Sequence, residues 1–251
     1  MSDYVQSLAR GISVIRSFST EAPRQTLSEV ARQTGLTRAT ARRLLLTLEE
    51  LGYVRSDGRH FELTARVLDI GYSYLASLNL NDIAQPFLES YSEALGESTS
   101  VSVLDDTDIV YVLRVPTKRI MTVSIGLGSR FPAYQTSMGR VLLAEQDDSE
   151  VLDRFNRSDQ SRTTEFTVAT GEALLERLHA VRHQGWALVD QELEVGVRSL
   201  AAPLRDASGT AIAAVNVSTH AGRTNLQELT EDFLPRLLET AASISRAIAM
   251  R

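Results

Sequence analysis

The strongest constraint in the sequence is a helix–turn–helix pattern that begins at residue 26 and leads directly into a hairpin signal. Thr26 to Glu29 ("TLSE") has the form of a capping box, in which the Thr and Glu side chains each accept a hydrogen bond from a backbone N–H at the helix start. The next stretch, "LSEVARQT", predicts a short helix that ends at Gly35, a residue suited to terminating helices. "LTRATARRLLLTLEEL" then predicts a second helix with its leucines along one face. This order is typical of a helix-turn-helix unit.

A hairpin is predicted immediately after the second helix, in the stretch "YVRSDGRHFEL". Its Asp57-Gly58 pair lies between alternating apolar and polar residues, which is a strong signal for a two-residue turn. A helix-turn-helix unit that leads into such a hairpin makes a winged helix, with Arg55, Arg59 and His60 near the tip of the wing.

The segment before this unit predicts one more amphipathic helix, because apolar residues recur there at helical spacing. The residues expected on its apolar stripe are Leu8, Ile12, Ile15 and Phe18. Residues 1–66 are therefore expected to form an all-α winged helix-turn-helix domain with a small β-hairpin wing.

The start of the second helix carries residues suited to contact DNA. In a helix-turn-helix unit this helix lies in the major groove, and its N-terminal residues meet the base edges. Arginine can donate two hydrogen bonds to guanine, threonine can bond a base edge or touch a thymine methyl, and either can hold a phosphate. A solvated helix face is the alternative explanation of the arginines, but the ordered pattern of capping box, glycine turn and hairpin favours DNA binding. The candidate DNA-binding residues are Thr26, Thr37, Arg38, Ala39, Thr40, Arg42, Arg43, Arg55 and Arg59.

The charge distribution points to an anionic partner for this first segment. The chain has a net charge of −6, yet residues 1–66 have a balance of +3 and the remainder a balance of −9. A basic segment on an acidic chain is typical of proteins that bind nucleic acid. The absence of cysteine excludes disulfides and thiolate chemistry. With no apolar run near the ~18 residues of a membrane span and no secretory signal, we expect a cytoplasmic protein without a membrane partner.

A helix is predicted over residues 65–83, with Leu68, Tyr72 and Leu75 on one stripe. It could join two domains and pair with a second copy of the chain, as two-fold readers of DNA require, or it could be a plain connection. We expect a linker helix over residues 67–82 and a second domain over residues 83–251.

The second domain mixes helical and strand patterns. A helix is expected from about residue 84, with Pro86 near its first turn. Alternating residues over 98–126 and 186–219 predict antiparallel strands. Helices are expected between these regions, and a long C-terminal helix interrupted at Pro235. The expected fold is α/β (α+β) with a mainly antiparallel sheet.

The stretch "RFPAYQTSMGRVLLAE" predicts a ligand site in this domain. A turn around Phe131-Pro132 should lead into a helix capped by Thr136 or Ser137. The first N–H groups of that helix, on Ser137, Met138 and Gly139, lack partners within the helix and suit an anion. A capped helix with solvated amides is the alternative.

Polar residues inside predicted strands support such a site. Ser199, Asn216 and Ser218 would need partners on a buried face, and a polar ligand could supply them. Asn216 and Ser218 are two residues apart and therefore share a face. The candidate counter-ions for a carboxylate are Arg119, Arg130 and Arg198, and the alternating Asp190, Glu192 and Glu194 could bond ligand hydroxyls or pair with arginines.

Signals for catalysis are weak. No nucleophile elbow, glycine-rich phosphate loop or His-Glu-x-x-His motif occurs. His179 and His183 lie one helical turn apart, but no third metal ligand is apparent, and a solvated helix face is the simpler explanation. We expect a regulator without a cofactor, rather than an enzyme.

The combination of an N-terminal winged helix, a linker helix and the stretches "RFPAYQTSMGRVLLA" and "GVRSLAAPLRDASGTAIAAVNVS" resembles the IclR family of bacterial transcriptional regulators. The resemblance covers essentially the whole chain. "VPTKRIMTVSIGLGSRFPAYQTSMGRVLLA", "VDQELEVGVRSLAAPL" and "AVNVS" resemble most the branch that regulates the β-ketoadipate pathway.

This resemblance implies a homodimer or a dimer of dimers that binds a double-stranded DNA operator and controls catabolic genes. It implies a small carboxylate effector in the C-terminal domain, such as protocatechuate, p-hydroxybenzoate or β-ketoadipate. The ligand-facing positions it implies are Ser137, Met138, Ser199, Asn216 and Ser218, with Asp190 nearby. The family often has Gly-Ala at Ser137-Met138, cysteine at Ser199 and serine at Asn216, and these departures favour an aromatic or dicarboxylic acid over a two- or three-carbon acid.

Two other functions remain open on the sequence. The second domain could serve dimerisation and protein partners without any small-molecule effector, in which case Asn216 and Ser218 would be ordinary surface positions. Alternatively it could turn over its ligand.

Overall fold

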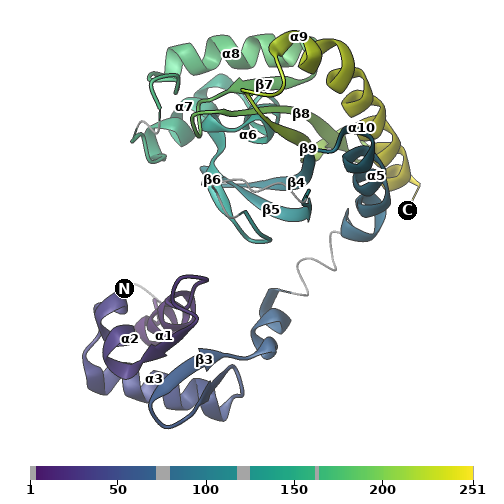
Figure 1. Cartoon of the computed structure of the whole chain (residues 1–251). Coiled ribbons are helices and arrows are strands. Elements are labelled where there is room, and N and C mark those ends of the chain that lie inside the picture. The colour runs from purple at the N-terminus through teal and green to yellow at the C-terminus, as the bar shows by residue number, and fades with distance from the viewer. Residues whose placement is uncertain (1–3, 72–79, 118–124, 162–163, 251) are drawn as a thin grey trace. The chain divides into compact units, whose positions relative to one another are not determined.

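The computed structural model describes residues 4–71, 80–117, 125–161 and 164–250. The chain divides into two compact units, Met1–Ser77 and Leu78–Arg251 (Figure 1). No helix of the described residues is long and apolar enough to cross a membrane.

Over residues 4–63, the N-terminal unit combines three helices with a small antiparallel sheet. Its helices are α1 (Gln6–Arg16), α2 (Leu27–Thr34) and α3 (Arg38–Glu50). The strands are β1 (Arg24–Thr26), β2 (Val54–Ser56) and β3 (His60–Leu63), in the order β1-β3-β2. The core consists of Val14, Phe18, Val30, Ala31, Ala41, Leu45, Leu48 and Val54. The predicted helix-turn-helix and hairpin are both present.

Local signals define the ends of these helices. Thr26 caps α2 in a complete capping box: its hydroxyl accepts the N–H of Glu29, and the Glu29 carboxylate accepts the N–H of Thr26 at 2.7 Å. Gly35 ends the helix with a φ of +66°, in the left-handed region that glycine adopts without strain. The side chain of Thr37 then caps α3 by accepting the N–H of Thr40.

Three expectations for this unit were wrong in detail. Of the predicted stripe, Ile15 and Phe18 pack in the core together with Val14, whereas Leu8 and Ile12 are 64% and 48% exposed. The hairpin turn is centred on Gly58 and Arg59 rather than on Asp57 and Gly58, since the N–H of Asp57 donates to the carbonyl of His60. Gly58, with a φ of +90°, takes the first central position, where glycine is favoured. The sheet also contains the unpredicted strand β1.

The segment after the wing is only partly described. A short 3-10 helix, Ala65–Val67, precedes a helical segment over residues 68–71. Leu68 is 74% exposed. Tyr72 and Leu75, expected on the stripe of the linker helix, lie outside the described residues.

The described residues of the C-terminal unit form a six-stranded antiparallel sheet with helices on both faces (Figure 1). The strands, in sheet order, are β6 (Arg130–Pro132), β5 (Asp108–Val115), β4 (Ser98–Asp105), β9 (Ala211–His220), β8 (Val197–Arg205) and β7 (Ala187–Asp190). One face is covered by α5 (Leu80–Leu95) and α10 (Leu234–Ala249). The other is covered by α6 (Ser137–Leu143), against which α8 (Gly171–Gln184) packs, and α8 in turn contacts α7 (Asp148–Arg157).

Two prolines lie at other places in their helix or strand than the sequence predicted. Pro86 lies inside α5, because the described helix already begins at Leu80 and not near residue 84. Phe131 and Pro132 belong to β6 rather than to a turn, and an edge strand tolerates a residue without an N–H. The C-terminal helix is interrupted as predicted: α9 (Leu226–Glu228) and a π-helix over Leu229–Phe233 precede α10, which has Pro235 in its first turn.

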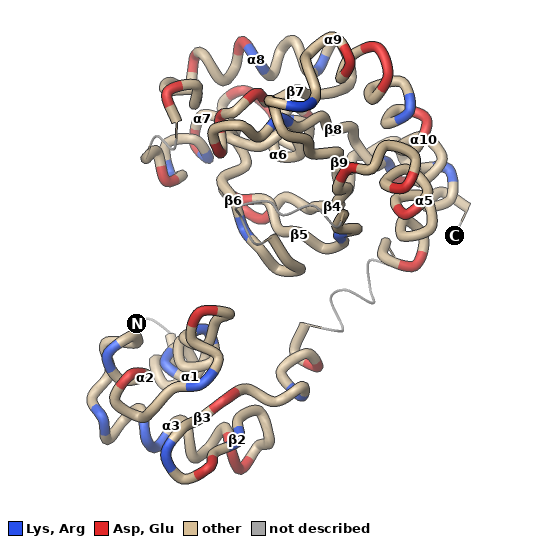
Figure 2. Tube along the Cα trace, viewed as in Figure 1, with Lys and Arg blue, Asp and Glu red and all other residues tan. Residues whose placement is uncertain are grey.

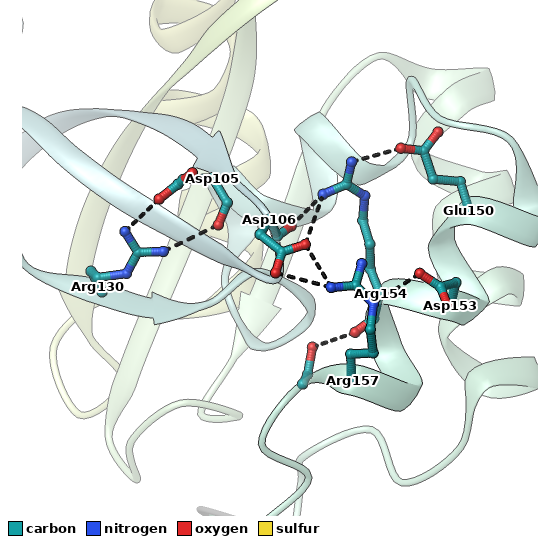
Figure 3. Close-up of polar contacts among 8 residues, drawn as sticks. Asp105, Asp106, Arg130, Glu150, Asp153, Arg154 and Arg157 are labelled. Atoms are coloured by element: carbon teal, nitrogen blue, oxygen red, sulfur yellow. Dashed lines mark hydrogen bonds and ion pairs between the residues drawn. The ribbon is translucent and has the colours of Figure 1, made fainter. Parts of the chain in front are cut away.

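The tight turn between β4 and β5 is fixed by ion pairs to α7 (Figure 3). Asp106 adopts a φ of +55°, and its carbonyl accepts a hydrogen bond from Arg154 at 2.5 Å while its carboxylate pairs with Arg157 at 2.8 Å. Arg130, on β6, donates to the carboxylate of Asp105 at 2.6 Å. These contacts hold the turn against the helix layer.

Candidate DNA-binding surface and ligand cavity

Helix α3 buries one face and exposes the face that carries its arginines. Ala41, Leu45 and Leu48 are buried in the core of the N-terminal unit. The residues exposed at the start and on the outer face of the helix are Thr37, Arg38, Ala39, Arg42 and Arg43, with Thr40 half-buried. The hydroxyls of Thr37 and Thr40 lie 2.9 Å apart, so the cap also orients the first turn.

The guanidinium groups of Arg38, Arg42 and Arg43 make no ion pair with any residue that the structure describes. Figure 2 shows the basic positions of the N-terminal unit, including those of α3. Since no nearby carboxylate neutralises these groups, their charge is available to phosphates or base edges.

The wing is held by its own carboxylates. Asp57 accepts the N–H groups of Arg59 at 2.9 Å and His60 at 2.7 Å, and pairs with Arg24. These contacts, the backbone N–H of His60 first, hold the pKa of Asp57 well below its usual range. Arg55 donates to Glu62 at 2.8 Å, which leaves Arg59 as the wing arginine that has no carboxylate partner among the described residues.

Thr26 differs from the other DNA-binding candidates, because its hydroxyl is committed to the capping box. It donates to the Glu29 carboxylate at 2.7 Å and accepts the N–H of the same residue. Its contribution within the chain is to fix the start of α2.

A cavity lies in the C-terminal unit between the start of α6, the sheet and the β7–β8 loop (residues 191–196). Its volume is about 30 Å3, room for one or two water molecules. The residues that line it are Tyr111, Ile125, Gln135, Thr136, Ser137, Val189, Leu193, Glu194, Val197, Ser199, Asn216 and Ser218. Four predicted ligand residues, Ser137, Ser199, Asn216 and Ser218, therefore come together although they are far apart in sequence.

Hydroxyl and amide groups are concentrated in the cavity wall. The hydroxyl of Ser137 donates to that of Ser199 at 2.9 Å. The Asn216 amide nitrogen donates to the Ser218 hydroxyl at 3.1 Å, which agrees with the predicted shared face. Asn216 is 3% exposed, and its Oδ1 atom is buried without a hydrogen-bond partner in the described part of the chain. A buried acceptor of this kind is costly unless a donor reaches it.

Met138 and Gly139 do not line the cavity, contrary to expectation. Met138 is buried in the hydrophobic core between α6 and the sheet. The Gly139 N–H donates to the Thr136 hydroxyl at 3.0 Å, so the cap that was predicted for this helix takes up the amide. A Cβ at Gly139 would lie 2.0 Å from the carbonyl oxygen of Ala133. Glycine here permits close packing of α6, which has only seven residues.

The charged residues proposed for a carboxylate ligand have other partners. Arg130 pairs with Asp105 at the far end of β4 (Figure 3), away from the cavity. Arg198 donates to Asp190 at 2.6 Å, so these two candidates neutralise each other. Arg119 lies outside the described residues. Of the alternating acids, Glu192 pairs with Arg140 and Glu194 lines the cavity.

The sequence pattern missed the polar residues Tyr111 and Gln135 of the cavity wall, and also Arg114, which shares a sheet face with Tyr111. A bulge in β5 inserts one extra residue, so that Arg114 lies opposite Ser100 and Tyr111 opposite Ser102. Both therefore lie on one sheet face, which Asn216 shares because it also pairs with Ser100. Burial raises the pKa of Tyr111 to about 12 and lowers that of Arg114. Three residues apart in a regular strand, the two would lie on opposite faces.

No group of three or more His, Cys, Asp or Glu side chains in the described part of the chain could hold a metal ion. His179 instead lies 2.9 Å from the carboxylate of Asp148.

Comparison with known proteins identifies both units. Residues 7–58 match the model of the IclR helix-turn-helix domain, and residues 72–246 match that of the bacterial transcriptional regulator IclR C-terminal domain. The chain belongs to the IclR family of bacterial transcriptional regulators. Its exposed α3 is thus the second helix of the helix-turn-helix in a family DNA-binding domain, and its cavity lies in the effector-binding domain.

Individual relatives extend this similarity over nearly the full length. The Pca regulon regulatory protein of Pseudomonas putida is 43% identical over 96% of this chain and 84% of its own length. The crystal structure of a protein from Rhodococcus sp. RHA1, assigned as a transcriptional regulator, is 55% identical, with a TM-score of 0.87 over 98% of this chain and 99% of that one.

One similar structure contains an aromatic acid. The inducer-binding domain of the PobR transcription factor from Acinetobacter, solved as a double mutant in complex with 3-hydroxybenzoic acid, is 33% identical with a TM-score of 0.61. The match covers 65% of this chain and 96% of that one.

Proposed function

We propose that this protein controls genes for the catabolism of aromatic acids, and that its effector is a hydroxybenzoate-type acid or β-ketoadipate. Membership of the IclR family and the similarity to a Pca regulon regulator support the choice of pathway. The aromatic acid bound by the PobR inducer-binding domain supports the choice of ligand class. In this proposal the ligand is bound and released unchanged.

The observation that carries the proposal is Oδ1 of Asn216 in the cavity wall, a buried acceptor with no hydrogen-bond partner among the residues that the structure describes. A phenolic hydroxyl donates one hydrogen bond and would satisfy this acceptor. The hydroxyls of Ser137, Ser199 and Ser218 can donate to a carboxylate or a keto group. Arg114, half-buried on the same sheet face, would supply the counter-charge that a carboxylate needs in a buried site.

The small volume of the cavity supports a regulatory role for binding. The space between these walls is small, so an aromatic acid would bind best to an arrangement in which they stand further apart. A ligand shifts an equilibrium between two arrangements only through its different affinity for them. An acid that binds best to the wider arrangement meets this condition.

The DNA-binding surface in this proposal is the outer face of α3 with the wing. Thr37, Arg38, Thr40, Arg42 and Arg43 would enter the major groove, and Arg59 would reach the phosphates beside it. Residues 1–66 act as the DNA-binding domain, 67–82 as the linker and 83–251 as the effector-binding and oligomerisation domain.

A homodimer, or a dimer of dimers, is part of the same proposal. Tyr4, Leu8 and Ile12 recur at helical spacing and are 69%, 64% and 48% exposed, as expected for a face that a second copy covers. Two copies would present two α3 helices to two half-sites of an operator.

The test is a thermal-shift screen of the full chain against protocatechuate, p-hydroxybenzoate, β-ketoadipate and pyruvate. A ligand at ~100 times its dissociation constant should add ~2.7 kcal/mol to the stability of the folded state. A shift with one of the first three acids but not with pyruvate supports the proposal. A shift with pyruvate alone, or with none of the acids, contradicts the ligand class. Recovery of the ligand unchanged after long incubation separates sensing from turnover.

A further inference from the structure

A buried ion pair joins α6 to the loop that forms one wall of the cavity. Nη2 of Arg140 lies 2.6 Å from Oε2 of Glu192, and the two side chains are only 3% and 10% exposed. Arg140 is one turn beyond Ser137 on α6, and Glu192 lies two residues before Glu194 in the β7–β8 loop. The pair therefore connects two of the segments that enclose the cavity.

Each partner is also fixed by its own surroundings. Nε of Arg140 donates to the carbonyl of Tyr134 at 3.0 Å, which ties the arginine to the turn preceding α6. The Glu192 carboxylate accepts the N–H of Val168 at 3.1 Å, and its carbonyl accepts the hydroxyl of Thr167 at 2.6 Å. The ion pair thus links the start of α6, the β7–β8 loop and the segment around Thr167 and Val168.

The β7–β8 loop has a backbone that can adopt few other shapes. Gln191 has a φ of +60° and Gly196 a φ of +86°. A Cβ on Gly196 would lie 2.9 Å from the His220 ring. The side chain of Gln191 accepts the N–H of Gly196 at 3.0 Å, which closes the loop on itself. A loop so constrained moves largely as a unit, so an attachment at Glu192 also positions Leu193 and Glu194 at the cavity.

The energetics favour a positioning role over a purely stabilising one. Removing two charges from water costs about as much as their attraction returns, so apolar residues of similar volume often stabilise such a site equally well. An ion pair, however, allows few geometries, because the donors of the guanidinium have fixed directions.

We propose that the Arg140–Glu192 ion pair positions the β7–β8 loop against α6, and that the effector-binding arrangement of the cavity depends on it. Both are positioning residues, since neither lines the cavity. This inference rests on the proposed function for the ligand, but its effect on the loop can be measured without any ligand.

The experiment compares two changes to the pair in the full-length protein. Glu192→Gln keeps an acceptor for Val168 and removes the charge. The double variant Arg140→Met/Glu192→Leu replaces both partners with apolar side chains and avoids leaving one charge unpaired, so it provides a folded comparison. The matched control is Glu145→Gln, which breaks the Arg205–Glu145 pair between the other end of α6 and the sheet, where the side chains are 38% and 36% exposed.

Two measurements are made on each variant. Hydrogen–deuterium exchange without ligand reports how often residues 189–197 open. Calorimetric titration with p-hydroxybenzoate, protocatechuate and β-ketoadipate reports effector affinity. We expect exchange in residues 189–197 to accelerate about tenfold and the dissociation constant to rise about tenfold, as when a competent arrangement is populated one-tenth of the time. Glu145→Gln should change neither.

The outcomes are distinguishable. A double variant that folds normally, keeps wild-type protection of residues 189–197 and binds the acids with wild-type affinity would overturn the inference. If the wild-type protein binds none of the three acids, the proposed ligand class fails, and exchange alone then decides whether the pair positions the loop. Faster exchange in that segment, absent in Glu145→Gln, supports the pair's role in either case.

Discussion

The hydroxyl of Ser137 donates to the hydroxyl of Ser199 at 2.9 Å, and this bond joins the start of α6 to β8 across the ligand cavity. Asn216 and Ser218 lie beside it on β9, and the side-chain oxygen of Asn216 has no partner among the described residues. A polar ligand can replace the bond between the two serines with bonds of its own and can also satisfy Asn216. The wall is thus able to exchange internal hydrogen bonds for bonds to a ligand.

Replacing Asn216 with leucine should weaken the response to effector without lowering stability. The substitution removes the hydrogen bond from Nδ2 to Ser218, but it also removes a buried Oδ1 that has no partner among the described residues. These two changes offset each other in the folded state, while a bound ligand loses a hydrogen-bond acceptor. We expect binding to weaken by about 1–3 kcal/mol, measured by calorimetry, with an unchanged unfolding midpoint.

Ser102→Ala is the matched control for that change. The Ser102 hydroxyl is also buried without a partner in the same sheet, but the residue does not line the cavity. It should leave ligand affinity unaltered. Equal losses of affinity in both variants would mean that Asn216 acts through the sheet and not through contact with the ligand.

Arg38→Ala should weaken operator binding by about 1–3 kcal/mol if Arg38 reads a base. The side chain is exposed at the first position of α3 and has no ion-pair partner among the described residues, so its loss should not destabilise the fold. Fluorescence anisotropy on operator and on random DNA separates the two kinds of contact. A loss that is equal on both DNAs would assign Arg38 to a phosphate instead.

Much of the fold could be predicted because its signals are local. The capping box at Thr26, the left-handed Gly35 and the shared face of Asn216 and Ser218 each depend on residues two to nine apart. Strand β1 could not be predicted in this way, since its three residues are extended only because they pair with β3, more than thirty positions away.

The parts of the proposed ligand site that were missed depend on long-range packing. Met138 was expected at the ligand, but the rotation of α6 is set by the close approach of Gly139 to Ala133, which turns Met138 into the core. Arg114 was missed because one extra residue in β5 changes which side chains share a face with Tyr111. Neither effect has a signature in the spacing of the residues themselves.

Stability of the wing should depend on pH through Asp57. Its pKa is lowered in the folded state by the N–H groups of His60 and Arg59 and by Arg24, from an unfolded value of about 3.9. A depressed pKa contributes stability that is fully present above pH ~4 and is lost as the pH falls through the folded value. Asp57→Asn should therefore be less stable than the wild type in urea at pH 7.

The difference between the two proteins should shrink as the pH is lowered from 5 to below 3. Asparagine keeps an oxygen that accepts the N–H groups of Arg59 and His60 but loses the charge that pairs with Arg24. A stability difference that stays constant over this range would show that the charge of Asp57 does not stabilise the wing.

Gly139→Ala should be strongly destabilising, whereas Gly11→Ala should not. A Cβ at Gly139 would lie 2.0 Å from the Ala133 carbonyl oxygen and 2.4 Å from the Ala133 Cα, both backbone atoms that cannot rotate away. Overpacking of this kind costs at least about 1–3 kcal/mol. Gly11 lies within α1 with no atom within 4 Å of its Cβ position, so alanine there should add about 0.5–1 kcal/mol through helix propensity. Chemical denaturation of both variants measures the contrast. Because Gly139 lies two residues after Ser137, a variant that tolerated alanine would mean that α6 can shift away from Ala133, and its ligand affinity would then show whether Ser137 and Ser199 still meet at the cavity.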